Sequence, residues 1–410
     1  MVDQENTLNA LNDEEIDDVE SDLNFDINKF SQAVIWGTDW TTETINNQML
    51  KMNIDLSPSF QRRDAWDNKE KSRLIESLML GLPVPPIILA ESNKKRNSYI
   101  VIDGKQRLLS IRQFYAAKTV NQETNQFKVL KLTGLEILKK YNGFTYDSQD
   151  TTDEYNQLIN ALDNQPIRTI VIKNWPDESF LYAVFLRLNT GSKKLSSQEL
   201  RQALNPGPFL EFLDRKTADS KALQKMLHNN GADKRMKDIE LALRYYAFRH
   251  SIRNYTGNLK EFLDNACDEF NRNWSRDAEK YEQDFSDLET AIEFCFENID
   301  PDNPFSRQDK TRPRFNRSLF ELFTYYFVSD KIRNLVKNSQ PEFKTGLEEL
   351  YKNEEFNAAT SFSTKNVQNV VKRFELFASM LNDLPSAKNI SIPCLTLTPD
   401  NHIDTELLQH

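Results

Sequence analysis

The hydrophobic pattern of this chain changes at one place, Asn205-Pro206-Gly207-Pro208, and that change limits the possible folds more than any other feature. Before it, short strand-like runs alternate with amphipathic helical runs. After it, the strand pattern nearly vanishes and apolar residues recur at helical spacing. Proline and glycine are strong breaks between elements. The sequence therefore predicts an α+β protein, with a mixed α/β N-terminal domain followed by a mostly helical C-terminal domain.

A chain of 410 residues is long enough for two or three domains, since domains commonly hold about 100–200 residues. We divide it into an acidic flexible head (1–29), the mixed domain (30–204), the helical domain (205–385) and a C-terminal tail (386–410). Helices in the C-terminal half are expected at Phe209–Lys216, Ile239–His250, Leu259–Trp274, Tyr281–Asn298, Arg317–Val328 and Asn366–Leu381.

The mixed domain has a short strand directly before a helix. Tyr99–Ile102 is a β-branched run that stops at Asp103-Gly104, and apolar residues at helical spacing follow over Lys105–Ala117. Upstream, Asp67 is placed to cap a helix that Gly81 ends. The other elements that we expect are a strand segment at Val84–Ala90, a strand at Ile167–Ile172, a helix at Glu178–Leu188 and a helix opened by the capping box Ser196-Ser197-Gln198-Glu199.

Charge is distributed unevenly along the chain. The formal net charge is −10, but residues 1–30 alone carry −9. Two later stretches are basic, 60–112 with +5 and 193–253 with +6, whereas 261–300 carries −10. The total therefore does not exclude an acidic partner such as DNA. The head is either a solubilising tail or an intramolecular mask that competes with an acidic ligand for a basic groove.

The sequence contains no targeting or membrane signal. No segment approaches the roughly 20 apolar residues of a membrane span, and the acidic N-terminus lacks the basic and apolar regions of a signal peptide. Cys267, Cys295 and Cys394 are widely spaced and form no CxxC pair, which suits a reducing compartment. We expect a soluble cytoplasmic protein with no membrane partner.

Several common catalytic signatures are missing from the sequence. There is neither GxxxxGK[ST] nor GxGxxG, which disfavours a P-loop or Rossmann nucleotide site. The four histidines show no HExxH or zinc-ligand spacing. One nuclease alternative stays open, because Asp330 followed by Glu342-Phe343-Lys344 resembles a PD-(D/E)xK metal-nuclease arrangement.

The strongest local signal is Ile102-Asp103-Gly104-Lys105-Gln106-Arg107. A helix that begins directly after a strand presents backbone N–H groups and the positive end of its dipole, so phosphate is the natural ligand. Lys105 and Arg107 would add positive charge, and Gln106 could orient a water molecule. Asp103 could hold Mg²⁺ through water. The structural alternative is an Asp N-cap with a glycine turn and exposed basic residues.

Two further clusters could serve the same anion. Phe60-Gln61-Arg62-Arg63 is followed closely by Trp66, so Gln61 and Arg62 could reach the helix start. Alternatively, the aromatic residues are core anchors and the arginines form surface ion pairs. In Arg187-Leu188-Asn189-Thr190-Gly191, Asn189 either supports the site or simply ends a helix.

Taken together, these motifs resemble a known family. The N-terminal domain of GmrSD-type modification-dependent restriction proteins, which is similar to the ParB/sulfiredoxin fold, usually carries the box Asp-Gly-Gln-Gln-Arg. Here Lys105 stands at the first Gln of that box. The resemblance spans roughly Trp40–Ala378 and includes Phe60-Gln61-Arg62, Trp66, Ser77, Pro83-x-Pro85-Pro86-Ile87, Arg187-x-Asn189-x-Gly191, Leu195-Ser196, Glu199, Arg235–Arg244, Leu259–Leu263 and Arg314–Glu321.

The resemblance implies binding and hydrolysis of a nucleoside triphosphate (NTP) with Mg²⁺. Carried over by position, Asp103, Gln106 and Arg107 are the catalytic candidates, with Asp103 also the metal ligand. The phosphate-binding candidates are Gln61, Arg62, Gly104, Lys105, Arg107 and Asn189. Related restriction enzymes also carry a His-dependent HNH nuclease domain, and no such cluster follows Pro208.

We therefore expect an NTP-binding, NTP-hydrolysing, DNA-associated protein of bacterial anti-phage defence. The alternatives are a nucleotide-gated switch without turnover, which binds DNA or a partner, and a nuclease with an unrecognised metal site. The nuclease or another defence subunit could also be encoded separately. A homo-oligomer is compatible with the sequence.

Overall fold

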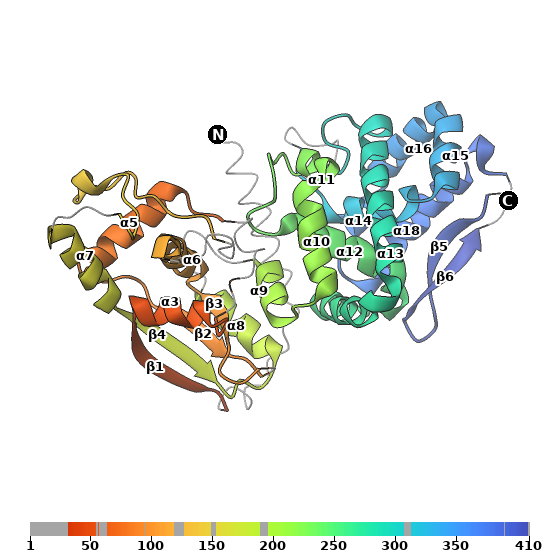
Figure 1. The fold of residues 1–410 in the computed structure, drawn as a ribbon. Coiled ribbons are helices and arrows are strands. Elements are labelled where there is room, and N and C mark those ends of the chain that lie inside the picture. Colours follow the sequence, from red (N-terminus) through yellow and green to blue (C-terminus); the bar gives the residue numbers. More distant parts are fainter. Residues whose placement is uncertain are drawn as a thin grey trace. The chain divides into compact units, whose positions relative to one another are not determined.

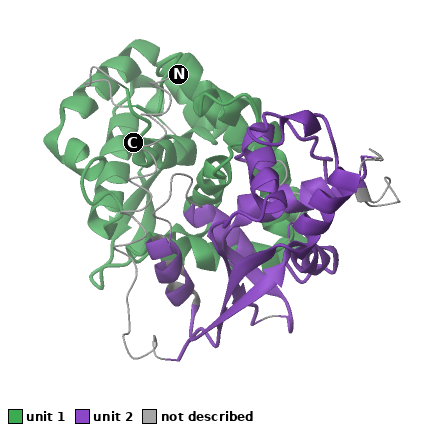
Figure 2. Cartoon of the chain, turned by 90° about the vertical axis from the view of Figure 1, so that its left-hand side faces the viewer, with its two compact units in different colours: residues 1–22, 205–410 green, residues 23–204 purple. Residues whose placement is uncertain are grey.

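The computed structural model describes residues 32–54, 56, 64–93, 95–118, 127–148, 153–188, 196–306, 313–388 and 390–408. The chain forms two compact units that meet in the sequence between Leu204 and Asn205 (Figure 2). We call them the mixed unit, whose described residues lie between 32 and 204, and the helical unit, whose described residues lie between 205 and 408.

The mixed unit contains one four-stranded sheet in the order β1-β4-β2-β3 (Figure 1). Strand β1 pairs antiparallel with β4, β4 pairs parallel with β2, and β2 pairs antiparallel with β3. This confirms the mixed α/β class for the N-terminal region. The elements are β1 (Val34–Thr41), α3 (Thr42–Leu50), α5 (Asn68–Met79), β2 (Ile87–Glu91), β3 (Tyr99–Asp103), α6 (Lys105–Tyr115), α7 (Asp153–Asn164), β4 (Pro166–Lys173), α8 (Glu178–Leu188) and α9 (Ser197–Leu204).

Local sequence signals explain several of these boundaries. Asp67 caps α5 through a capping box with Glu70, and Gly81 follows the helix with a φ of +68°. The central strand β2 is almost entirely buried. The core of the mixed unit lies between the sheet and helices α3, α5 and α6, with Ile75, Leu89 and Ile111 among its buried members.

Glu76 on α5 holds a loop against the helix. Its carboxylate accepts backbone N–H groups from Glu136, Ile137 and Leu138 at 3.1, 2.8 and 2.7 Å. The side chain is buried, so these charge-assisted hydrogen bonds replace water that the carboxylate loses on folding. Although burial raises the pKa of Glu76, the backbone hydrogen bonds bring it below its ordinary value of 4.5.

The helical unit is built from helices that pack on one another (Figure 1). The largely helical class of the C-terminal region is thereby confirmed. The helices are α10 (Pro208–Asp219), α11 (Lys221–Met226), α12 (Lys237–Ser251), α13 (Leu259–Asn298), α14 (Arg317–Phe327), α15 (Asp330–Asn338), α16 (Gln340–Lys352), α17 (Glu354–Ala359) and α18 (Val367–Asn382).

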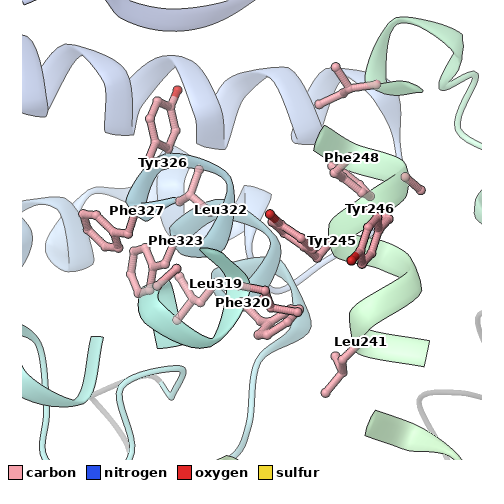
Figure 3. Close-up of a cluster of buried hydrophobic side chains, with 14 of the residues drawn as sticks. Leu241, Tyr245, Tyr246, Phe248, Leu319, Phe320, Leu322, Phe323, Tyr326 and Phe327 are labelled. Atoms are coloured by element: carbon pink, nitrogen blue, oxygen red, sulfur yellow. The ribbon is translucent and has the colours of Figure 1, made fainter. Parts of the chain in front are cut away.

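The core of this unit is rich in aromatic side chains. In Figure 3, Tyr245 and Phe248 of α12 lie in the same cluster as Phe320 and Tyr326 of α14. Edge-to-face ring pairs are frequent, for example Tyr325 with Phe374, whose ring centroids are 5.1 Å apart. Such pairs add a small favourable term to the burial of apolar area.

Two features differ from the sequence interpretation. The predicted helices Leu259–Trp274 and Tyr281–Asn298 form one continuous helix, α13, because residues 275–280 contain neither glycine nor proline. Residues 386–410, interpreted as a tail, include the antiparallel hairpin of β5 (Ile392–Leu397) and β6 (Ile403–Leu408). Ile392 and Leu395 of that hairpin are buried in the helical core. Among the residues that the structure describes, no helix has the length and apolar character needed to cross a membrane.

The Glu76 contacts generate a stability prediction. We expect Glu76→Gln to lower the free energy of unfolding by about 2–4 kcal/mol, because backbone donors lose a charged acceptor. The matched control is Glu136→Gln in the same loop, because the exposed side chain of Glu136 pairs with Arg73. We expect this control to change the free energy of unfolding by less than about 1 kcal/mol. Urea denaturation followed by circular dichroism measures both; equal effects would contradict the assignment.

The lowered pKa of Glu76 fixes the direction of the pH dependence. The stabilisation is present above pH 4.5 and is lost as the pH falls through the lowered folded-state pKa. The difference in Tm between the wild type and Glu76→Gln should therefore be largest near neutral pH and shrink towards pH 3. A difference that grows on acidification would be inconsistent with this account.

Candidate functional site

The turn between β3 and α6 depends on Gly104. This residue has φ 103° and ψ 11°, the left-handed conformation, and forms the N-cap of α6 without a side-chain cap. A Cβ atom there would lie 3.2 Å from Cγ1 of Ile87 and 3.3 Å from Nη2 of Arg107. The first N–H groups of an α-helix have no partner within the helix. Among the residues that the structure describes, no side chain caps them at this end of α6.

Arg107 and Asp103 form an ion pair across that turn. Nη2 of Arg107 donates to Oδ2 of Asp103 at 2.6 Å and to the carbonyl oxygen of Pro86 at 2.9 Å. The side chain of Asp103 is 36% exposed and that of Arg107 is 14% exposed. Nε of Arg107 is buried and has no hydrogen-bond partner among the described residues. The pair is therefore partly exposed, and Nε of Arg107 takes no part in it.

Gln106 connects the start of α6 to the segment before α5. Its Oε1 accepts the backbone N–H of Trp66 at 3.3 Å. In the same segment, Oδ2 of Asp64 accepts hydrogen bonds from Nζ of Lys71 and from Nε2 of Gln113, the latter at 3.2 Å. Residues 64–66 are thus held by side chains of both α5 and α6.

Lys105 points its ammonium group at a carboxylate from a distant part of the sequence. Nζ of Lys105 lies 2.6 Å from Oε1 of Glu199, and both side chains are almost fully buried. Glu199 also accepts the backbone N–H of Ser196 at 2.7 Å, while Ser196 Oγ accepts the N–H of Glu199. This is the capping box expected at the start of α9. The structure therefore gives Lys105 a structural contact, and its expected phosphate contact stays a prediction.

All five residues of the Asp-Gly-Lys-Gln-Arg box (103–107) lie at the end of β3, in the turn or at the start of α6. Gln61, Arg62 and Asn189 lie outside the described residues. Their convergence on this turn stays a prediction. The contact that sequence reasoning missed is Lys105 with Glu199, because 94 residues separate the two and no local pattern relates them.

Part of the basic charge of residues 60–112 is used in contacts within the mixed unit. Ion pairs join Lys71 with Asp64, Arg73 with Glu136, Lys105 with Glu199 and Arg107 with Asp103. Arg112 is buried, with its guanidinium carbon 4.8 Å from the centroid of the Phe127 ring, and burial lowers its pKa. The net charge summed along this stretch of sequence thus overstates the positive charge that is available to a ligand.

The residues of the nuclease alternative lie on two helices of the helical unit. Asp330 opens α15 and pairs with Arg333, whereas Glu342 and Lys344 belong to α16. Within the described ranges, no group of three or more His, Cys, Asp or Glu side chains is placed to hold a metal ion.

Removing the partner of Glu199 tests the buried pair. We expect Lys105→Gln to destabilise the protein by about 3–5 kcal/mol, because the buried charge of Glu199 is no longer balanced by Lys105. The double variant Lys105→Gln, Glu199→Gln should recover part of the loss. A double-mutant cycle from denaturation curves measures the coupling. The control Lys140→Gln breaks an exposed pair with Glu154 and should lower the free energy of unfolding by less than about 1 kcal/mol. If Lys105→Gln lowered it by no more than this control, the assignment would be refuted.

Comparison with known proteins identifies the mixed unit. Residues 43–205 match the family described as GmrSD restriction endonuclease, N-terminal domain. The match includes the β3–α6 turn and ends beside Pro206, whereas the resemblance in the motifs extends to Ala378. No curated protein and no solved structure matches the chain. Residues 43–205 therefore belong to the N-terminal domain family of GmrSD restriction endonucleases.

Proposed function

We propose that the start of α6 binds the phosphates of a nucleoside triphosphate and that the chain hydrolyses it in a bacterial anti-phage restriction system. The observation that carries this proposal is the turn at Gly104. It combines a helix N-terminus whose N-cap is a glycine, without a side chain that could cap it, and a partly exposed Arg107–Asp103 pair. Membership of residues 43–205 in a restriction-system family supplies the context.

The chemistry of the turn suits a phosphate group. The backbone N–H groups and the helix dipole favour an anion at this end of α6. Because residue 104 has no Cβ, Nη2 of Arg107 can lie close to the backbone of the turn. Arg107 can direct two of its N–H donors to a phosphoryl group, and its side chain is partly exposed. Binding would draw Arg107 away from Asp103.

Asp103 fits the role of a magnesium ligand. Its partly exposed carboxylate lies beside the proposed phosphates, and Mg²⁺ is commonly held by one or two carboxylates together with phosphate oxygens and water. When bound there, the ion would neutralise phosphate charge. The residues of the chain would then have separate tasks: Arg107 stabilises the charge that develops on the γ-phosphate, and the amide of Gln106 orients the attacking water.

A second function, nucleotide binding without turnover, is favoured by one contact. Oε1 of Gln106 accepts the N–H of Trp66, so the group that would orient the water is engaged with the protein. If this contact persists when nucleotide binds, the site holds an NTP without positioning a nucleophile, and binding would act as a switch for DNA or a partner protein.

Phosphate release separates these functions. We expect the full chain with Mg²⁺ to release inorganic phosphate from an NTP. The Arg107→Ala variant should release phosphate at least about tenfold more slowly, because it lacks the charge-assisted contact between the guanidinium group and the phosphate. Arg107→Lys should recover only part of the rate, since it lacks the bidentate geometry. The matched control is Arg73→Ala, which removes an exposed arginine of the same unit and should leave the rate unchanged. All four NTPs are tested, with Tm measured for each variant.

The outcomes of that assay are distinct. A rate in the wild type equal to that of Arg107→Ala would remove the enzymatic proposal. Tight NTP binding by calorimetry without phosphate release would instead establish the switch. If no NTP binds with Mg²⁺ present, both functions fail.

We also propose DNA as the macromolecular target, on the basis of the family. Fluorescence anisotropy with a labelled duplex at low and at physiological salt tests this, since phosphate contacts weaken steeply with salt. If the acidic head, with −9 over residues 1–30, masks a basic surface, deleting residues 1–28 should tighten binding at low salt. Unchanged affinity would leave the head a solubilising tail, and no binding at low salt by either protein would reject DNA as the target.

A further inference from the structure

The helical unit contains a cavity of about 420 Å³ that the proposed nucleotide site does not use. Its walls come from α12, the starts of α13 and α14, the loop 360–365 and α18. Ligand pockets in proteins commonly measure about 300–1,000 Å³, so the volume is sufficient for a small organic ligand.

Basic side chains dominate the charge of this cavity. One carboxylate, that of Glu321, lines it together with five basic residues: Arg244, Arg314, Arg317, Lys365 and Arg373. Within the described part of the chain, the wall therefore carries a surplus of positive charge. Such a surplus in a partly enclosed space favours an anionic ligand, because low-dielectric walls strengthen its attraction to the charges.

Buried ion pairs hold the guanidinium groups of the wall in place. Arg373 is 1% exposed; its Nη2 lies 2.7 Å from Oε2 of Glu321 and its Nη1 lies 2.5 Å from the carbonyl oxygen of Thr364. Nη1 of Arg244 lies 2.8 Å from the other oxygen of Glu321. Glu321 is thus bracketed by two arginines, and its charge is already engaged. Arg244 and Arg373 are therefore held in fixed positions by Glu321.

Nε of Arg373 and the guanidinium group of Arg314 are not used by these pairs. Nε of Arg373 is buried and has no hydrogen-bond partner among the described residues, and burial lowers the pKa of the Arg373 guanidinium. Arg314 is exposed and makes no ion pair with the residues that the structure describes. A buried polar atom without a partner is costly, whereas the exposed Arg314 is open to an acceptor in the cavity.

The start of α14 adds a second anion-binding element. Asn316 caps this helix of 11 residues, and Asn316, Arg317 and Ser318 all line the cavity. The positive end of the helix dipole is therefore directed to the same space as the arginines. Thr360, Ser361, Ser363 and Thr364 of the facing loop supply hydroxyl groups.

Aromatic side chains form the remaining wall. Phe248, Tyr255 and Phe315 line the cavity, and Phe362 is 75% exposed although it is a large apolar side chain. An exposed phenylalanine beside an anion site is suited to stack on a planar base. Inorganic phosphate would leave this aromatic surface unused.

We propose that this cavity of the helical unit binds a nucleotide through its phosphate, with the phosphate among Arg314, Arg373 and the start of α14 and the base against Phe362. The nucleotide is either free or the phosphorylated end of a nucleic-acid strand. Both present the same chemistry, and the experiment separates them.

Calorimetry on the full chain tests this in an Arg107→Ala background, so that the α6 site contributes as little as possible. The probes are deoxyadenosine monophosphate, inorganic phosphate and a 5′-phosphorylated single strand of 12 nucleotides. We expect a nucleotide probe to bind, and Arg314→Glu to weaken it at least about tenfold, because the reversal replaces an attractive charge with a repulsive one. Phe362→Ala should weaken nucleotide about fivefold or more and leave inorganic phosphate unchanged.

The controls keep the test interpretable. Arg314 and Phe362 are exposed, so their variants should keep the wild-type Tm. Arg253→Glu changes an exposed arginine of the same unit that pairs with Asp404 and does not line the cavity, and it should not alter binding. Binding of the free mononucleotide identifies a free ligand, whereas binding of the strand alone identifies a strand end.

Three results would overturn the proposal. In the first, no nucleotide probe binds. In the second, Arg314→Glu has no more effect than Arg253→Glu. In the third, inorganic phosphate binds as tightly as the mononucleotide and Phe362→Ala has no effect on nucleotide binding.

Discussion

The buried contact between Lys105 and Glu199 is the constraint on which the arrangement of the mixed unit's site depends. It joins the first residue of α6 to the capping box of α9, so two helix starts are held by one ammonium–carboxylate pair. A buried pair of this kind adds little net stability, but removing one partner is costly. We infer that the pair positions the start of α6, and that Arg107 and Asp103 on the same turn remain available for a ligand.

The helical unit uses buried charge in a similar way. Glu321 is held between Arg244 and Arg373, and Glu240 lies 2.7 Å from Arg244 and 3.7 Å from Arg317. These carboxylates fix the guanidinium groups beside a core that is otherwise apolar. In both units, ion pairs within the protein preorganise basic groups. Preorganisation lowers the cost of binding an anion, because fewer side chains lose conformational freedom when it arrives.

Local sequence patterns predicted the elements near the site well. The strand before Asp103, the helix after Gly104, the capping box of Asp67 and that of Ser196 are all present, because each depends on residues only a few positions apart. Two kinds of feature were not predicted. Strand β1 lies at an edge of the sheet and exposes Val34, Ile35 and Trp36, so it lacks the usual alternation. Tertiary pairs such as Lys105–Glu199 leave no local pattern in the sequence. The composition of the Asp-Gly-Lys-Gln-Arg box therefore indicated more free positive charge than the structure has, because the charge of Lys105 is paired.

The central claim is that the turn at Gly104 is a phosphate site, and a crystal structure of the full chain with a non-hydrolysable NTP analogue and Mg²⁺ tests it most directly. The account predicts phosphate oxygens within hydrogen-bonding distance of the backbone N–H groups at the start of α6. It also predicts that Arg107 contacts a phosphate instead of Asp103, and that Asp103 faces the metal ion or its water. An analogue bound elsewhere in the mixed unit, with the Arg107–Asp103 pair intact, would contradict it.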